Sequence, residues 1–461
     1  MLVPKLERDI GIEVYATRSP GIGGAIKRDV EDFVVEEVLV DGSKAQENEP
    51  NSDVGKSVIG SSGRKSSFLL CTLVKRNWDT FISLAKIAYQ LGIRPSQIQF
   101  AGIKDARAFT SQFITIKDGS VEDVQSLHLK DVQVRPIGYL RAALSSYFLL
   151  GNSFHIAIKT VKHSATTTRR RFVKIADEIK VSGGVPNFFG HQRFGTVRPI
   201  THLVGKAIVK GSLENAVMLF LAKSSPDEHP TSREARLELW QTRSLEKAMC
   251  DFPKQLRYER LMLKSLAERP CDFAAALRRL PPRLCELFVQ GYQSYLFNRS
   301  LSERIKKGLS LSAAEVGDYA VSVERSGLPM LTMFKRVSHD NRAEVNKAVE
   351  KGKMRLAIPL IGHRQCPSEG VQGDIERRIL EEEGVSPSDF RVACLAELSA
   401  KGKLRSVIAP VKDLSFECLR DRSAEKLRSR VNVDFMLYRG SYATVVLREF
   451  MKARNLIAAG F

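Results

Sequence analysis

The sequence predicts an α+β protein whose strands lie near the two ends of the chain and whose middle is mainly helical. Short apolar or alternating runs, the pattern typical of strands, occur between residues 33 and 158 and again at 431–437. Residues 200–410 show mainly helical patterns instead. We expect the strand at 431–437, in which every second residue is apolar, to rejoin the sheet of the first domain.

Size and charge predict a multidomain protein with a polyanionic partner. A chain of 461 residues is expected to hold two or three domains, because a single core rarely grows past roughly 250–300 residues. Its 72 Lys and Arg against 52 Asp and Glu give a net charge of +20, which favours nucleic acid. An anionic membrane surface would also fit the charge, but the longest apolar run, 68–74, is too short to span a bilayer. The first residues have no signal-peptide core, so we expect a cytoplasmic protein outside the membrane.

The cysteines and histidines do not predict a metal site. The seven cysteines are scattered without C-x-x-C spacing, as in a protein of a reducing compartment. The eight histidines show no paired ligand spacing. We therefore expect no bound metal.

The first predicted strand follows an acidic turn at 29–32, and Lys27 lies just before that turn. The pair Glu36 and Glu37 on this strand is expected to form a solvated strand edge. The segment 41–67 is rich in Gly, Ser, Asn and charged residues, which predicts a mobile loop with no packed role.

A β-α-β unit follows. Residues 68–74 predict a buried strand, and 77–91 predict a helix with apolar residues at helical spacing, Asp79 or Thr80 as its cap and Gly92 just past its end. A short strand is predicted at 98–101, and a polar bend follows it directly.

That bend is the stretch around which the prediction of function is built. It carries Lys104, Asp105, Arg107 and Gln112 between two strand-like runs. A carboxylate held between strand ends and flanked by cations can stay ionised at neutral pH, which makes Asp105 a candidate nucleophile. The alternative is an ordinary polar turn, in which Gly and Asp are common.

Three further segments complete the outline. Residues 152–158 alternate as a strand after Gly151, and 166–180 predict a helix with basic residues near its start that either face solvent or contact phosphates. The loop at 184–195 combines glycines with aromatics, a composition that either shapes a loop or walls a site for a flat ligand.

Taken in chain order, five stretches resemble the TruD family of pseudouridine synthases. They are Lys27 with EDFVVE at 31–36, FAGIKDARAFTSQ at 100–112, GNSF at 151–154, PNFFGHQRFG at 186–195 and GSYATVVLRE at 440–449. Each run alone is a weak indication of the family. Five runs in the family's order, spread from residue 27 to 449, make a chance match very unlikely, and together they cover nearly the whole chain. The helical stretch at 200–410 matches loosely beyond QSYLFN at 293–298.

The resemblance implies a pseudouridine synthase catalytic core, a mixed and largely antiparallel sheet flanked by helices, with a family-specific α+β insertion domain. We expect residues 1–190 and 411–461 to form the catalytic domain and 191–410 the insertion. The implied reaction converts a uridine of tRNA, at position 13, into pseudouridine. The substrate supplies all atoms of the product, so no cofactor is expected; tRNA is the expected partner, and a monomer is favoured.

The resemblance also assigns roles to single residues. Asp105 matches the catalytic aspartate, Lys27 the basic residue paired with it, and Phe154 the aromatic that stacks on the target base once the base has left its stem. Asn152 matches a further residue of the active-site strand. Without the resemblance, Phe154 is better interpreted as a core residue of its strand.

Three residues of the loop at 184–195 are weaker candidates for substrate binding. Phe188 and Phe189 could wall the same pocket, and Arg193 could hold a backbone phosphate or a loop carbonyl.

Two other classes of protein fit part of the sequence. A non-catalytic RNA-binding or RNA-chaperone protein needs only the charge and the aromatic loops, but it has no need of an ionised carboxylate where RNA docks. An RNA-directed hydrolase or glycosidase usually has paired carboxylates or a metal set, and neither is evident beside Asp105.

Overall fold

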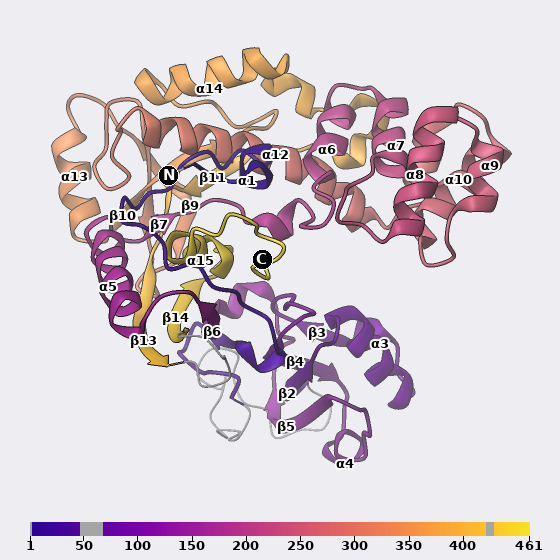
Figure 1. Cartoon of the computed structure of the whole chain (residues 1–461), viewed down its shortest axis with the longest axis horizontal. Coiled ribbons are helices and arrows are strands. Elements are labelled where there is room, and N and C mark those ends of the chain that lie inside the picture. The colour runs from indigo at the N-terminus through magenta and orange to yellow at the C-terminus, as the bar shows by residue number, and fades with distance from the viewer. Residues whose placement is uncertain (1, 47–67, 421–427) are drawn as a thin grey trace.

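The computed structural model of the protein describes residues 2–46, 68–420 and 428–461. These residues form an eight-stranded sheet in the order β13-β14-β6-β1-β4-β2-β5, with β3 pairing along β4 (Figure 1). Within this part of the chain the neighbours pair antiparallel, except β1 and β4, which pair parallel. The predicted mixed, largely antiparallel sheet is therefore confirmed. Its strands are β1 (Phe33–Leu39), β2 (Phe68–Arg76), β3 (Ile98–Phe100), β4 (Phe109–Lys117), β5 (Val132–Leu140), β6 (Leu149–Val161), β13 (Val411–Arg420) and β14 (Ser429–Tyr438).

The two ends of the chain meet in this sheet, as predicted. Strand β14 pairs antiparallel with β6, from Ser429 opposite Val161 to Tyr438 opposite Gly151. Alternation of apolar residues on both strands places one row of side chains against the covering helices. The prediction that the last strand rejoins the first sheet is confirmed.

The predicted β-α-β unit is also present. Helix α3 (Thr80–Gln90) begins after Asp79, whose carboxylate accepts hydrogen bonds from two backbone N–H groups of the first turn. Strands β2 and β3 do not pair with each other, because β4 lies between them and pairs with both. The loop 101–108, which carries Asp105, connects β3 to β4.

Helices cover the sheet around the other site segments. Helix α5 (Ala165–Val181) closely matches its predicted range and packs against β13 and β14. The other α-helices and strands described outside 201–406 are α1 (Lys5–Asp9), α4 (Val121–Gln125), β7 (Val185–Pro186), β12 (Ile408–Ala409) and α15 (Ala443–Met451). The predicted mobile loop at 41–67 lies mostly outside the described residues; of its described part, Ala45 is fully buried, so the expectation that it has no packed role is wrong there.

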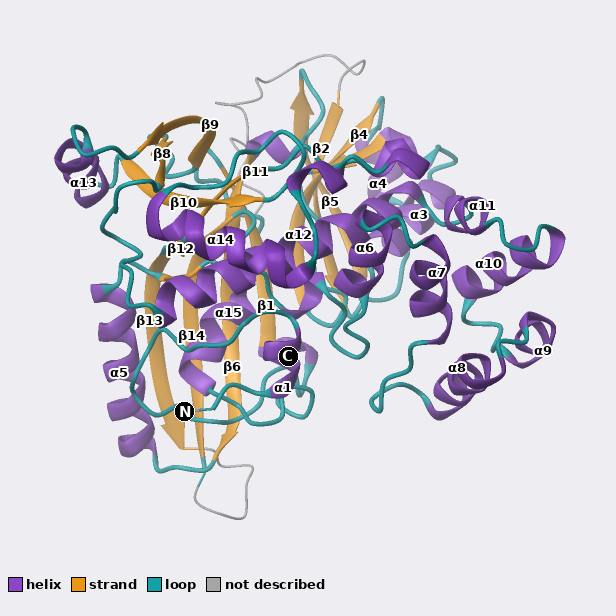
Figure 2. Ribbon diagram, turned by 90° about the horizontal axis from the view of Figure 1, so that it is seen from above, coloured by secondary structure: helices purple, strands orange, loops and turns teal. Residues whose placement is uncertain are grey.

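Residues 201–306 are mainly helical, as predicted, and residues 213–278 extend away from the large sheet (Figures 1 and 2). The helices are α6 (Thr201–Val209), α7 (Leu213–Ala222), α8 (Pro230–Thr242), α9 (Leu245–Asp251), α10 (Arg257–Glu268), α11 (Phe273–Arg278) and α12 (Pro282–Lys306).

The prediction of a mainly helical middle is wrong for residues 319–406. Within this described range a second, four-stranded sheet forms in the order β11-β10-β8-β9. Most of β9 is exposed, so its sequence lacks the apolar alternation of a half-buried strand. The elements are β8 (Tyr319–Val323), β9 (Pro329–Arg336), α13 (Arg342–Glu350), β10 (Met354–Leu360), α14 (Gly370–Glu383) and β11 (Lys403–Ser406).

The largest hydrophobic core joins the two sheets. Side chains of β6 and β14 share this core with α5, α15, β10 and the last turns of α12, while α6–α11 and α14 pack around a second core. The junction between the large sheet and the segment 201–406 is therefore a packed interior, against which loops can be held in place. No helix in the described ranges has the length and apolar character needed to cross a membrane.

Candidate active site

The structure brings the two predicted catalytic residues together. The ammonium Nζ of Lys27 lies 3.6 Å from Oδ2 of Asp105, although 78 positions of sequence separate the residues. The side chain of Lys27 is 13% exposed and that of Asp105 is 33% exposed. The carboxylate is thus paired with a cation and still open to a substrate.

The position of Lys27 is fixed by its surroundings. Its backbone has φ of +55°, a left-handed conformation that is uncommon for residues other than glycine. Its Nζ lies 4.2 Å from the ring centroid of Phe33, within the range of a cation–π contact. Unusual backbone conformations held by packing often occur at active sites.

A buried lysine, Lys75, holds the backbone of Asp105 in place. Nζ of Lys75, on β2, donates to the carbonyl of Asp105 at 3.0 Å and to that of Trp78 at 2.7 Å. Burial lowers the pKa of Lys75 to about 8, although the nearby Asp105 carboxylate opposes that shift. The hydroxyl of Thr80, at the start of α3, lies 3.3 Å from both the backbone nitrogen and the carbonyl of Lys104 and ties the neighbouring residue to the helix.

A fully buried ion pair lies beside the same loop. Nζ of Lys104 is 2.5 Å from Oε1 of Glu37, and the backbone N–H of Phe113 donates to the other oxygen at 2.9 Å. The expectation of a solvated strand edge is therefore wrong for Glu37, because β1 is an interior strand with β6 on one side and β4 on the other. Glu36 points to the opposite face, where it lies 3.4 Å from His155.

Unpaired polar atoms gather on the same face of the sheet as Glu37. Thr110, Gln112 and Asn152 each have a buried side-chain oxygen without a hydrogen-bond partner in the described structure. Asn152 lies opposite Glu37, and Thr110 lies opposite Val35, two residues earlier on β1. Buried polar groups are nearly always paired in folded proteins, so these three oxygens are candidates to bind an ordered water or a ligand group.

Asp105 and Lys27 line a cavity of about 370 Å³ with a basic rim. Arg28 and Arg107 contribute to that rim, and Gln192 reaches it from the loop after β7. A cavity of this size suits one small flat ring, and its rim suits the phosphates that flank a nucleoside.

The other predicted residues lie around this cavity rather than in it. Phe154 is 6% exposed and packs between Phe33, at a centroid distance of 6.2 Å, and Phe435, at 5.3 Å. The ring of Phe33 therefore contacts both Phe154 and the ammonium group of Lys27. Asn152 lies on the same face of β6, two residues closer to the start of the strand.

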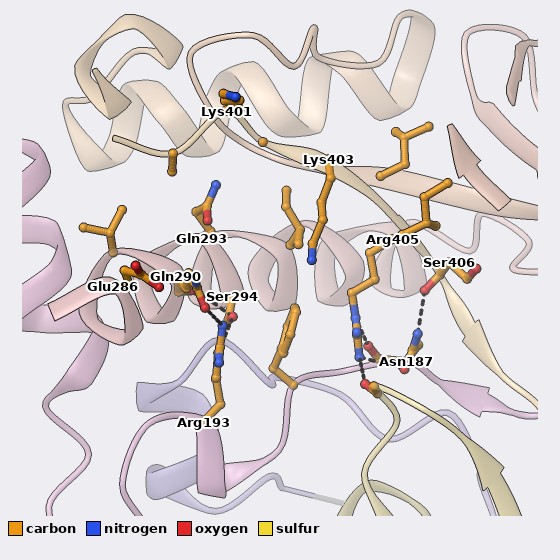
Figure 3. Close-up of a pocket in the computed structure, with 18 of the residues that line it drawn as sticks. Asn187, Arg193, Glu286, Gln290, Gln293, Ser294, Lys401, Lys403, Arg405 and Ser406 are labelled. Carbon is orange, nitrogen blue, oxygen red and sulfur yellow. Dashed lines mark hydrogen bonds between the residues drawn. The ribbon is translucent and has the colours of Figure 1, made fainter. Parts of the chain in front are cut away.

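The aromatic loop divides between the core and a second cavity. Phe188 is fully buried in the core, whereas Phe189 and Arg193 line a cavity of about 810 Å³ on the other side of the loop (Figure 3). Of this loop, Gln192 is the residue that reaches the Asp105 cavity, and it was not singled out in the sequence.

The sequence analysis did not single out Lys75 or the buried pair of Lys104 and Glu37. The alternation along the strand could have indicated the pair, because Glu37 falls on the same face as the apolar residues Phe33 and Val35. A charged residue at a position that alternation assigns to the core is a candidate for a buried pair.

Comparisons with known proteins show the family of this chain. The family model for tRNA pseudouridine synthase D (TruD) matches residues 9–450. The chain belongs to the TruD family. It is thus a tRNA pseudouridine synthase, an isomerase, as the resemblance predicted.

Relatives of the TruD family match over nearly the full length. A protein of Methanococcoides burtonii named "Probable tRNA pseudouridine synthase D" is 37% identical, covering 98% of this chain and 99% of its own. A Pyrococcus abyssi protein of the same name is 34% identical, with 95% and 98% covered. The crystal structure of a TruD protein from Methanosarcina mazei superposes with a TM-score of 0.81 at 36% identity, with 98% and 99% covered. The predicted fold class is confirmed.

Proposed function

We propose that this TruD-family enzyme isomerises the uridine at position 13 of tRNA, with Asp105 as the catalytic carboxylate and Lys27 as its ionic partner. The observation that carries the proposal is the 3.6 Å contact between Lys27 Nζ and Asp105 Oδ2 at a basic-rimmed cavity. The carboxylate is partly exposed and lies where a nucleoside can reach it.

The reaction needs one ionised carboxylate and a protected pocket. The C–N glycosidic bond breaks, the detached uracil turns, and C5 forms a new bond to C1′, so that every atom of the product comes from the substrate. A carboxylate can attack C1′, add to the uracil ring, or remove the 2′ proton to give a glycal. Asp105 serves in each of these routes. Lys27 keeps the carboxylate oriented and compensates its charge in the partly buried site.

The polar face beside Asp105 supports recognition of the detached uracil. The side-chain amides of Asn152 and Gln112 offer donors and acceptors that match the imide N–H and carbonyl oxygens of the base. Their side-chain oxygens are buried and unpaired in the described structure, so a bound base would satisfy them. The hydrogen bond from Lys75 to the backbone carbonyl of Asp105 would fix the position of the carboxylate relative to this face of the sheet.

Phe154 is proposed to stack on the everted base. It neighbours Asn152 on β6 and contacts Phe33, the ring beneath Lys27, so its edge lies next to the proposed pocket. An aromatic ring at this place offsets part of the free energy lost when a base leaves its stem.

We also propose the division into a catalytic domain, 1–190 with 411–461, and an insertion domain, 191–410. In support, the described strands of the eight-stranded sheet come from 33–161 and 411–438, while the four-stranded sheet and the helices α6–α14 come from 201–406.

Mapping of pseudouridine in tRNA tests the proposed function. Unmodified tRNA transcripts are incubated with the purified protein and sequenced after chemistry that marks pseudouridine. We expect one new pseudouridine at position 13. Pseudouridine at another position would overturn the assignment of the target, and no new pseudouridine in any RNA would favour a non-catalytic RNA-binding protein.

A further inference from the structure

A second cavity, of about 810 Å³, lies next to the Asp105 cavity and is separated from it by the loop after β7. Gln192 of this loop lines the first cavity, and its neighbour Arg193 lines the second. Helix α12, strand β11 and the turn after β14 form the other walls (Figure 3). Such a volume is in the range that holds a small ligand or a nucleotide.

Basic side chains face this second cavity from different elements. Lys403 reaches in from β11 and Arg193 from the loop opposite, while Arg405 lies deeper along the same strand (Figure 3). The cavity therefore concentrates positive charge from segments that are more than 200 positions apart in the sequence.

The partners of these cations are neutral throughout the described ranges. Arg193 donates to Gln290 at 2.9 Å and to Ser294 at 3.3 Å. Arg405 donates to Asn187 Oδ1 at 2.8 Å and to the carbonyl of Gly440 at 2.9 Å.

Lys403 Nζ has no hydrogen-bond or ion-pair partner among the described residues. Two carboxylates line the cavity, but Glu397 is paired with Arg278 at 2.9 Å, and Glu286 pairs with none of these cations.

The positive charges destabilise one another. Burial lowers the pKa of Arg405 to about 10, and repulsion from Arg193 adds to the shift. Lys403 is more exposed than the two arginines, and its pKa is also lowered, first by partial desolvation of the ammonium and then by repulsion from Arg405 and Arg193. A cluster of like charges without counterions is unfavourable for folding, and a bound anion would relieve it.

An aromatic face completes the cavity. The guanidinium carbon of Arg405 lies 3.9 Å from the ring centroid of Phe189, and that of Arg193 lies 5.7 Å from the same ring. Stacked guanidinium and aromatic planes beside a phosphate-binding charge are a common arrangement where single-stranded RNA binds.

The second cavity lies within reach of an RNA bound at Asp105. Leu149 lines its wall at one end of β6, and Phe154 lies five residues further along that strand, or roughly 16 Å at the usual rise per residue. Both sites can therefore contact one RNA chain at different nucleotides.

We propose that this cavity binds a phosphate of a tRNA nucleotide other than the target uridine, with Lys403, Arg193 and Arg405 as its ligands. The inference rests on the proposed function, because it takes tRNA as the substrate. The site is a positioning site that anchors the RNA while the target base reaches Asp105. A free phosphate-bearing compound presents the same chemistry, and the experiment below separates the two sources.

The variant Lys403→Met in the full-length protein tests the proposal. We expect tRNA to bind about tenfold more weakly, as for the loss of one charge-assisted contact, and the slope of log K against log salt to become shallower by about one. We expect turnover at saturating tRNA to stay within about twofold, because the reacting groups are untouched. Since Lys403 has no partner to lose, Tm should stay unchanged or rise, which a merely structural role would not give.

Two further variants serve as controls. Lys347→Met removes the same charge from an exposed position of α13 and should change tRNA affinity less than Lys403→Met does. Lys403→Arg keeps the charge and should restore most of the affinity.

The proposal is overturned if Lys403→Met binds tRNA as tightly as the unaltered protein and with the same salt dependence. If inorganic phosphate raises Tm of the unaltered protein but not of Lys403→Met, while tRNA affinity is equal, the site binds a free phosphate compound and not tRNA. Failure of the proposed function would be seen separately, as full turnover by Asp105→Asn at unchanged tRNA affinity.

Discussion

Lys104 and Glu37 form an ion pair in the interior of the large sheet, with Nζ and Oε1 2.5 Å apart and both side chains almost fully buried. The pair joins the strand β1 to the loop that carries Asp105, which follows Lys104 directly. The carboxylate of Asp105, the proposed catalytic group, is thus attached to a rigid part of the sheet, although it lies on a loop.

We predict that breaking this pair destabilises the protein strongly. Glu37→Gln leaves the Lys104 ammonium buried without a counterion, which costs about 3–5 kcal/mol of the free energy of unfolding. Urea denaturation measures the loss. The double variant Glu37→Gln with Lys104→Met should recover most of it, because no buried charge remains. Purely additive effects of the two changes would contradict the pairing.

Removal of the cation beside Asp105 should impair catalysis rather than folding. In Lys27→Met the carboxylate loses the charge 3.6 Å away, and we expect kcat to fall on the order of a hundredfold or more. Single-turnover kinetics with tRNA provide the measurement, and Arg28→Met, at the rim of the same cavity, is the matched control with a smaller expected effect. Equal losses in the two variants would show that the ion pair has no special role.

The buried Lys75 predicts a pH dependence of stability. Its pKa is lowered from 10.5 to about 8 in the folded protein. Below pH 8 both the folded and the unfolded state hold the proton. Between about pH 8 and 10.5 the unfolded state holds more protons, so the free energy of unfolding should rise with pH relative to Lys75→Met. Chemical denaturation of both proteins from pH 7.5 to 10 tests the sign, and a difference that falls with pH would refute the assignment.

Phe154 can be tested as a stacking residue separately from its place in the core. Phe154→Leu keeps an apolar side chain in the core and should cost less than about 2 kcal/mol of stability, but it removes the flat face, so kcat/KM for tRNA should fall at least tenfold. Ile156→Leu, two residues along the same face of β6, is the control and should leave kcat/KM nearly unchanged. If both variants behave alike, Phe154 is a core residue only.

The features that could be predicted from the sequence are those with a local pattern. Helices α3 and α5 and the strands β6 and β14 follow from the period of their apolar residues and from caps such as Asp79. The polar bend with Asp105 was visible as a break between two strands. Its pairing with Lys27 came from the resemblance alone, because no local pattern reports a contact across 78 positions.

The features that could not be predicted depend on the order of strands. Whether Glu37 is solvated or buried is decided by the neighbours of β1 in the sheet, which the sequence of β1 does not contain. The loop at 184–195 illustrates the same limit, because one residue, Gln192, lines the Asp105 cavity and the next, Arg193, lines the second cavity. The strand β9 escaped detection because most of its side chains are exposed.

The central claim is that the carboxylate of Asp105 is required for the reaction and not for binding RNA. Asp105→Asn keeps the size of the side chain and the backbone contact with Lys75. Release of tritium from tRNA labelled at C5 of uridine measures turnover, and a filter-binding assay on the same preparation measures affinity. We predict a loss of turnover of at least about a thousandfold with tRNA affinity within about threefold; near-normal release of tritium would contradict the claim.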